Sequence, residues 1–138
     1  MRPTIMTIAA ALASLMATAG TAADLRVVVS GLRSGAGLIQ VAVCPKELFA
    51  KRGCPFTATG LAADGAVTVR GIPPGVYAVQ AFHDENGNGD LDRRAFWPLE
   101  GLGFSRDAPM RRGPPRFGDA AMRIDGNGTV NLTMRYFG

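Results

Sequence analysis

Hydrophobic and polar residues alternate along most of the chain. In an extended strand this spacing places the apolar side chains on one face and the polar side chains on the other. The residues predicted to face inward are Leu25, Val27 and Val29; Ile39, Val41 and Val43; Val67 and Val69; Tyr77, Val79 and Ala81; and Val130, Leu132, Met134 and Tyr136. The pattern therefore predicts several short strands with one buried side each.

Turn-forming sequences separate these segments, at residues 64–65, 73–75 and 125–128. Glycine and asparagine accept positive φ, and proline fixes its own φ, so these residues favour tight reversals of the chain. No segment after residue 24 shows sustained helical periodicity. We predict an all-β fold, an antiparallel β-sandwich of about seven strands with an immunoglobulin-like architecture.

The first 23 residues differ from the rest of the chain. Arg2 is the only charged residue before Asp24, and the apolar stretch ends in small residues at Ala22 and Ala23. This arrangement is typical of an export signal. We predict a signal peptide over residues 1–23 and a single β-sandwich domain over residues 24–138. The alternative is a retained membrane anchor, because the uncharged stretch is long enough to span a bilayer.

Export places the domain in the periplasm or outside the cell, without stable membrane insertion after cleavage. Removal of Arg2 lowers the formal net charge from +4 to +3. The basic residues are scattered, which argues against nucleic acid as a partner and favours weak attraction to anionic polymers. We expect a monomer whose partner is another protein or an anionic envelope polysaccharide.

Cys44 and Cys54 are the only cysteines. An even pair in an exported protein predicts one disulfide, which would close a loop of about ten residues and stabilise the fold by about 3 kcal/mol. A redox or zinc pair is the alternative, but the C-x-x-C spacing typical of such sites is missing.

A long irregular loop is predicted between Arg93 and Gly118, because prolines and glycines interrupt any period there. It holds Phe96, Trp97, Phe104 and Phe117 together with six arginines. Aromatic and arginine side chains together are suited to stacking on a sugar or holding an anion. The alternative is that the aromatic residues close one end of the fold while the arginines stay in solvent.

The stretch FHDENGNGDLD, residues 82–92, carries the clearest candidate chemistry. Counted from Asp84, oxygen-bearing side chains fall at positions one, three, five and nine, and Gly89 stands at position six. Alternate residues of a tight loop turn inward, and a hard cation requires several oxygen ligands. We predict a calcium site, with magnesium as the second choice. Its ligands are Asp84, Asn86, Asn88, the backbone carbonyl of Asp90, and Asp92.

The loop is not an EF-hand. Ala95 stands where the bidentate acid of position twelve would be, and no helix is predicted on either side. Glu100 or Asp107 would have to complete the ligand shell. The alternative interpretation is a polar β-turn that binds nothing, since Asn-Gly pairs are a strong hairpin signal.

Catalysis is the second class of function. His83 is the only histidine, and it lies at the end of a predicted strand, where it can equally cap the turn. None of the serines after residue 24 lies in a G-x-S-x-G motif. We therefore assign no catalytic residue and prefer a noncatalytic module. The alternative is a small secreted hydrolase that uses His83 or the carboxylates between Asp84 and Asp92.

Three motifs occur in order: GIPPGVYAVQAFHDENGNGDLD, EGLGFS and GPPRFGDAAMRI. In this order they resemble the domain of unknown function 2141 family of small exported bacterial proteins. The resemblance implies a β-sandwich similar to transthyretin-like domains and no established activity. Within the loop it covers His83, Asp84, Asn86, Asn88, Gly89, Leu91 and Asp92.

Overall fold

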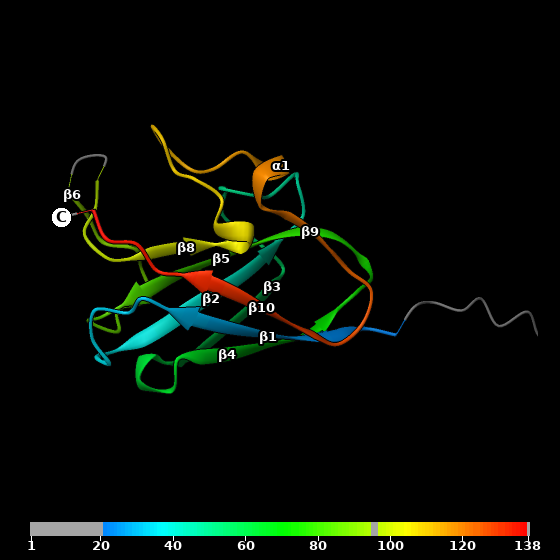
Figure 1. Ribbon diagram of the computed structural model, residues 1–138, viewed down its shortest axis with the longest axis horizontal. Helices are drawn as coiled ribbons and strands as arrows, with labels where there is room; N and C mark the ends of the chain where they lie inside the picture. The colour runs from blue at the N-terminus through cyan, green and yellow to red at the C-terminus, as the bar shows by residue number, and fades with distance from the viewer. Residues whose placement is uncertain (1–20, 95–96, 138) are drawn as a thin grey trace, which may run out of the picture.

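The computed structural model describes residues 21–94 and 97–137, and these residues form a mostly β structure (Figure 1). Residues 1–20 of the predicted signal peptide lie outside the described residues, as do Ala95 and Phe96 of the predicted loop. The first strand begins at Ala23, and the Ala23 side chain is buried. The signal peptide and its cleavage site stay predictions.

Strand β1 (Ala23–Ser30) is the centre of a three-stranded sheet. It pairs antiparallel with β4 (Ala66–Ile72) and parallel with β10 (Gly128–Thr133). The prediction of purely antiparallel strands is therefore wrong for this sheet. The alternation of side chains determines which face of a strand is buried, but it carries no information on the direction of the neighbouring strand.

Strand β5 (Gly75–Asp84) is the centre of a second, five-stranded sheet. Strand β2 (Leu38–Cys44) pairs with one edge of β5, and β3 (Phe56–Leu61) pairs with the far edge of β2. These pairings are antiparallel, as predicted. A short 3-10 turn, η1 (Ala62–Asp64), then leads from β3 to β4 of the first sheet.

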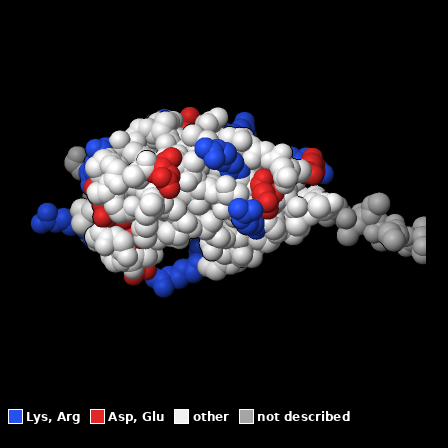
Figure 2. All heavy atoms as spheres, turned by 90° about the horizontal axis from the view of Figure 1, so that it is seen from below, with Lys and Arg blue, Asp and Glu red and all other residues white. Residues whose placement is uncertain are grey.

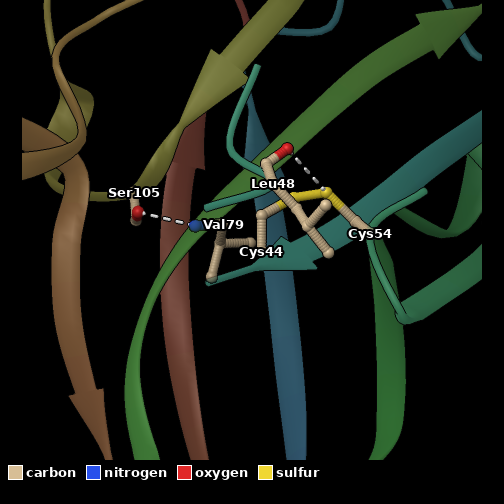
Figure 3. The surroundings of a disulfide bond; sticks show 5 residues. All are labelled: Cys44, Leu48, Cys54, Val79 and Ser105. Carbon is tan, nitrogen blue, oxygen red and sulfur yellow. Dashed lines mark hydrogen bonds between the residues drawn. A yellow bond between two sulfur atoms is a disulfide. The ribbon is translucent and has the colours of Figure 1, made fainter. Parts of the chain in front are cut away.

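Two short strands share the other edge of β5. Strand β8 (Leu102–Phe104) pairs with residues 80–82, and β9 (Ala121–Ile124) pairs with residues 75–78. Val79 lies in the gap between them. Its N–H donates to Ser105 Oγ at 2.9 Å (Figure 3). The Ser105 hydroxyl in turn donates to the carbonyl of Ala120. Ser105 thus supplies the partner that no strand provides at this point.

The two sheets share one apolar core, and they overlap in the view of Figure 1. Thirteen residues predicted to face inward are buried in it, namely Leu25, Val27, Val29, Ile39, Val41, Val43, Val67, Val69, Tyr77, Val79, Ala81, Leu132 and Met134. Val130 and Tyr136 pack against this cluster and are partly buried. Each fully buried aliphatic side chain stabilises the fold by about 1.5–3 kcal/mol. The predicted inward faces are confirmed.

A second apolar cluster lies on the opposite face of the β5 sheet. Cys44 and Phe104 contribute to it from the strands, and Phe49 packs on Phe104 with ring centroids 6.2 Å apart. The predicted disulfide between Cys44 and Cys54 is present and ties the intervening loop to the end of β2 (Figure 3). The disulfide thus holds the loop that carries Phe49 against this face.

The described residues between Arg93 and Gly118 contain more regular secondary structure than predicted. It contains a small hairpin of β6 (Arg93–Arg94) and β7 (Trp97–Pro98), then β8 and a 3-10 turn, η2 (Ser105–Asp107). A one-turn helix, α1 (Phe117–Ala120), follows. The structure thus has ten strands in the described residues rather than about seven.

The aromatic and basic residues of this segment separate in the structure. Phe104 and Phe117 pack with Phe49 in the second cluster, whereas Trp97 is 63% exposed. The six arginines are exposed; these are Arg93, Arg94, Arg106, Arg111, Arg112 and Arg116. The arginines stay in solvent, as the second interpretation predicts, but Phe104 and Phe117 cover one face of the sheet and not one end of the fold.

Charge is mixed on the face that Figure 2 shows, where acidic and basic side chains are interspersed among uncharged ones. Ion pairs link Arg70 with Asp24 and Arg123 with Asp125 at the surface. In the part of the chain that the structure describes, no helix has both the length and the apolar character needed to cross a membrane.

Candidate functional site

Asp84 ends β5 and is fully buried. Its two carboxylate oxygens accept the backbone N–H groups of Asn88, at 3.2 Å, and Gly89, at 2.9 Å. Gln40, on the neighbouring strand β2, donates its side-chain N–H to the same carboxylate at 3.1 Å. Asp84 therefore closes the loop onto the end of the sheet, and it is held in place from both sides.

The two asparagines continue the same winding. Asn86 Oδ1 accepts the N–H of Asn88 at 3.2 Å, and Asn88 Oδ1 accepts the N–H of Asp90 at 3.0 Å. A side chain that accepts the N–H two residues later forms an Asx-turn. Gly89 has a φ of +80°, in the left-handed region that glycine adopts without strain. The turns therefore arise from the residues that the spacing singled out.

Asp92 is partly buried and bonds to both asparagines of this loop. Its carboxylate accepts the side-chain N–H groups of Asn86, at 2.6 Å, and of Asn88, at 2.9 Å. The structure thus brings Asp92 to both asparagines, while Asn88 contacts Asp84 through its backbone N–H. Four of the predicted ligands, Asp84, Asn86, Asn88 and Asp92, are therefore joined by direct hydrogen bonds.

Glu100 is the acid that the structure adds to this site. Its side chain is 4% exposed, and its two oxygens accept the N–H groups of Glu85, at 2.8 Å, and Asp92, at 3.1 Å. Glu100 therefore bridges the two ends of the loop. Asp107, the other acid considered for the site, lies elsewhere and accepts the N–H of Thr133.

The charges of the loop are only partly balanced. Arg33 pairs with Glu85, and this hydrogen bond raises the pKa of Arg33. Within residues 21–94 and 97–137, Asp84, Asp92 and Glu100 form no ion pair with a basic side chain. Three carboxylates therefore lie close in sequence and space to one loop without a cationic partner in that part of the chain.

The carboxylates do not by themselves form a metal cage. Among the described residues, no group of three or more histidine, cysteine, aspartate or glutamate side chains is arranged to hold a metal ion. Asp90 is exposed, and its N–H is engaged with Asn88. Any cation site in this loop therefore depends on the amide oxygens of the asparagines and on backbone carbonyl oxygen.

Close packing against a neighbouring loop fixes the base of the site. Gly37, which precedes β2, has a φ of +71°, and a Cβ built there would lie 2.3 Å from the carbonyl oxygen of Asp84. Only glycine permits this approach. Gly37 and Gln40 were not identified from the sequence, because no local pattern predicts their contact with Asp84. Gln40 and Asp84 are 44 positions apart.

His83 lies in the interior and not at a cleft. It is fully buried, with Nδ1 2.8 Å from the Tyr136 hydroxyl and Nε2 2.7 Å from the carbonyl oxygen of Ala36. Since a carbonyl oxygen only accepts, Nε2 carries the proton and Nδ1 accepts from the hydroxyl. Ser30 and Ser105 donate to backbone carbonyls, and neither is bonded to His83.

His83 therefore links β5 to Tyr136 of the C-terminal segment and to the backbone at Ala36, which is a structural role. The imidazole has no carboxylate among its hydrogen-bond partners in the described residues, and both of its nitrogens are occupied. The carboxylates of Asp84 and Glu100 are likewise occupied by backbone N–H groups. The arrangement fits a loop that is built to hold a shape or an ion.

Comparison with known proteins gives a family but no activity. No curated protein and no solved structure matches the chain significantly. The model of a family described as "Uncharacterized protein conserved in bacteria (DUF2141)" matches residues 27–132, a span that includes all three sequence motifs and the loop. The resemblance drawn from those motifs is confirmed, and the chain belongs to the DUF2141 family.

Proposed function

We propose that this chain is a noncatalytic exported domain whose loop from Asp84 to Asp92 binds one calcium ion. The observation that carries the proposal is the run of side-chain to backbone hydrogen bonds at Asp84, Asn86 and Asn88. These bonds wind the loop around Asp92 at the positions where the spacing predicts ligands. A loop already wound in this way loses less conformational entropy when it binds an ion.

The available donors are all oxygens. Asp84 and Asp92 supply carboxylates, Asn86 and Asn88 supply amide oxygens, and Asp90 supplies its backbone carbonyl. Calcium takes six to eight such ligands in flexible geometry, and water completes an incomplete shell. The mixture of two carboxylates with neutral oxygens therefore fits calcium better than a transition metal, which prefers histidine or cysteine.

Binding requires one local change. The side-chain N–H groups of Asn86 and Asn88 now donate to Asp92. Each amide oxygen keeps the backbone N–H that it now accepts, and a small shift of the side chain turns its second lone pair toward the ion, so the Asx-turns are preserved. A bound cation would then replace the two N–H donors, and it would also neutralise the carboxylates that lack a basic partner. Glu100 would keep its role of holding the ends of the loop.

The location and the fold class belong to the same proposal. A disulfide is typical of an oxidising compartment, so it supports the periplasm or the exterior of the cell. The two sheets with a shared core support a β-sandwich of immunoglobulin or transthyretin type. We propose that such a domain serves as an interaction or structural module of the envelope.

The test is thermal unfolding of the purified protein in calcium and in chelator. An ion that binds only the folded state, present at 100 times its Kd, adds about 2.7 kcal/mol to the free energy of unfolding. For a domain of this size the expected rise in Tm is on the order of 10 °C. An unchanged Tm across a range of calcium concentrations would refute the site.

Two variants of the same loop separate the site from a general charge effect. Asp92→Asn keeps a side chain of the same shape but removes a charged ligand, and we expect it to abolish most of the calcium-dependent rise. Asp90→Ala removes a carboxylate from the same loop but keeps the backbone carbonyl, and we expect it to retain most of the rise. Equal losses of the calcium-dependent rise in the two variants would indicate a diffuse charge effect. In a separate activity screen, we expect the protein to leave esterase and glycosidase substrates uncleaved.

A further inference from the structure

A groove lies on the outer face of the β5 sheet, on the side away from the main core. Its cavity volume is about 700 Å³, within the range of roughly 300–1,000 Å³ that is usual for small-molecule sites. Phe82 of β5 and Leu102 and Phe104 of β8 form the floor. The second apolar cluster covers one part of this face, and the groove is the part that it leaves open.

The rim of the groove is basic. Lys51 and Arg52 come from the disulfide loop, Arg93 from β6, and Arg111 and Arg112 from the segment that precedes α1. We call the site the basic groove, defined by these five cations and the floor of Phe82, Leu102 and Phe104. Three segments far apart in sequence therefore contribute positive charge to one cavity.

The described part of the chain supplies no acidic side chain that pairs with the five cations. Among the described residues, the ion pairs involve Arg33, Arg70 and Arg123, and none involves a cation of the basic groove. The described residues that line the cavity include no aspartate or glutamate. Cations that converge around a low-dielectric cavity attract an anion strongly, because the cavity concentrates their field.

The remaining lining is almost entirely apolar. Among the described residues that line the groove, the uncharged side chains with a polar group are Gln80 and Trp97, and the others include Leu91, Met110 and Phe137. Trp97 also lines the groove and is 63% exposed, which leaves a large aromatic surface in contact with water. The apolar floor and the basic rim together fit a ligand that joins a hydrocarbon part to a negative charge at one end.

We propose that the basic groove binds a single-chain anionic amphiphile, of which a fatty acid is the simplest example. The acyl chain lies on Phe82, Leu102 and Phe104, and the burial of its apolar surface stabilises the complex. The carboxylate lies at the rim, where the guanidinium groups of Arg111 and Arg112 are suited to pair with it. Trp97 covers the ligand from the open side.

Polarity distinguishes this ligand from an anionic polysaccharide. A polysaccharide presents hydroxyl groups along its length, and each requires a hydrogen-bond partner when it is buried. Among the described residues that line the groove, the side chains that can bond a hydroxyl group are Gln80, Trp97 and the five cations of the rim, whereas the floor of Phe82, Leu102 and Phe104 offers none. The proposal does not rest on calcium binding, because the three floor residues and all five cations lie outside residues 84–92.

The test uses the single tryptophan of the chain as the probe. Dodecanoate, kept below its micelle concentration, is added to the purified protein while the emission of Trp97 is recorded in chelator. We expect a saturable blue shift with one Kd, because the acyl chain displaces water from the indole. Dodecyl maltoside, which has the same chain with a neutral head, should bind at least tenfold more weakly, and acetate should cause no shift.

The matched variants reverse charge inside and outside the groove. The double variant Arg111→Glu with Arg112→Glu should raise the Kd for dodecanoate at least tenfold. Arg26→Glu, on the exposed side of β1, should leave it unchanged. Equal affinity for dodecanoate and dodecyl maltoside would overturn the proposal, as would an unchanged Kd in the double variant. Binding to phosphatidylglycerol vesicles without binding to free dodecanoate would also overturn it, in favour of a membrane surface.

Discussion

At the scale of the residue, four buried polar side chains complete the hydrogen bonding around β5. They are His83, Asp84, Glu100 and Ser105. Burying a polar group is unfavourable unless it is hydrogen-bonded. In the described residues every buried side-chain nitrogen and oxygen has a partner. Asp84, Glu100 and Ser105 each accept backbone N–H groups at points where no strand supplies a carbonyl.

Replacement of Ser105 by alanine tests this role. Ser105→Ala would leave the N–H of Val79 and the carbonyl of Ala120 without their partner in a fully buried position. We expect the free energy of unfolding, measured with urea, to fall by about 1–3 kcal/mol. Ser30→Ala is the control, because the exposed Ser30 hydroxyl also donates to a carbonyl. Equal, small losses in both variants would contradict the account.

Tyr136 gives a prediction that depends on pH. Burial raises the pKa of Tyr136, partly offset by the N–H of Arg33 that donates to its hydroxyl. The folded state therefore keeps the phenol protonated at pH values where the unfolded chain, with a pKa of about 10, ionises. The stability linked to this shift is fully present below pH of about 10 and is lost as the pH rises through the folded pKa.

The variant Tyr136→Phe isolates this contribution. At neutral pH it should lower the free energy of unfolding by about 1–3 kcal/mol, because His83 Nδ1 and the N–H of Arg33 lose their partner. Above pH of about 10 the difference from the unchanged protein should narrow. Urea denaturation of both proteins between pH 7 and 11 measures this difference. A difference that stays constant over that range would exclude the proposed linkage.

At the scale of the element, the sequence determines which strands are easy to predict. The alternating apolar residues of β1, β2, β4, β5 and β10 are long enough to indicate both the strand and its buried face. Strands β8 and β9 have three and four residues, so they show no period. They form because the edge of β5 offers unpaired backbone groups, which is a property of the fold and not of their own residues.

In the loop of residues 84–92, too, some contacts could be predicted from local sequence and others depend on the fold. Asp84, Asn86, Asn88 and Asp92 could be selected from spacing, since local turns bring alternate residues together. The roles of Gln40 and Gly37 could not, because the pairing of β2 with β5 places them there. Glu100 was a candidate only by its charge. Its contact with both ends of the loop depends on the turn between β7 and β8.

The disulfide loop is the element whose contribution is simplest to measure. Replacing Cys44 and Cys54 together by alanine removes the bond that constrains the unfolded chain. We expect a loss of about 3 kcal/mol in the free energy of unfolding, as for a loop of this length. The double variant should be insensitive to reducing agent, whereas the unchanged protein should be destabilised by it. Equal stability with and without reducing agent in the unchanged protein would contradict the prediction.

At the scale of the whole molecule, the net charge does not show how the basic residues are distributed over the surface. The sequence gives a modest excess of basic residues, but the fold places five of them around one cavity. They come from segments separated by up to 61 positions, between Lys51 and Arg112. Such clustering cannot be predicted from composition or local pattern, because it depends on how the loops pack over the outer face of the β5 sheet.

The loop and the basic groove are neighbours in the molecule. Leu91, within the loop, and Arg93, directly after it, both line the groove. An ion that fixes residues 84–92 would therefore also restrict one wall of the groove. This gives the calcium proposal a consequence beyond stability, since ordering a wall before the ligand arrives reduces the entropy lost on binding.

The most direct test of the calcium site is a crystal structure of the protein grown in saturating calcium. The account predicts one ion with oxygen ligands at about 2.3–2.6 Å from Asp84, Asn86, Asn88 and Asp92 and from the carbonyl of Asp90. The amides of Asn86 and Asn88 would then present oxygen, not nitrogen, to the centre of the loop. An ion-free loop in which both amides still donate to Asp92 would contradict it.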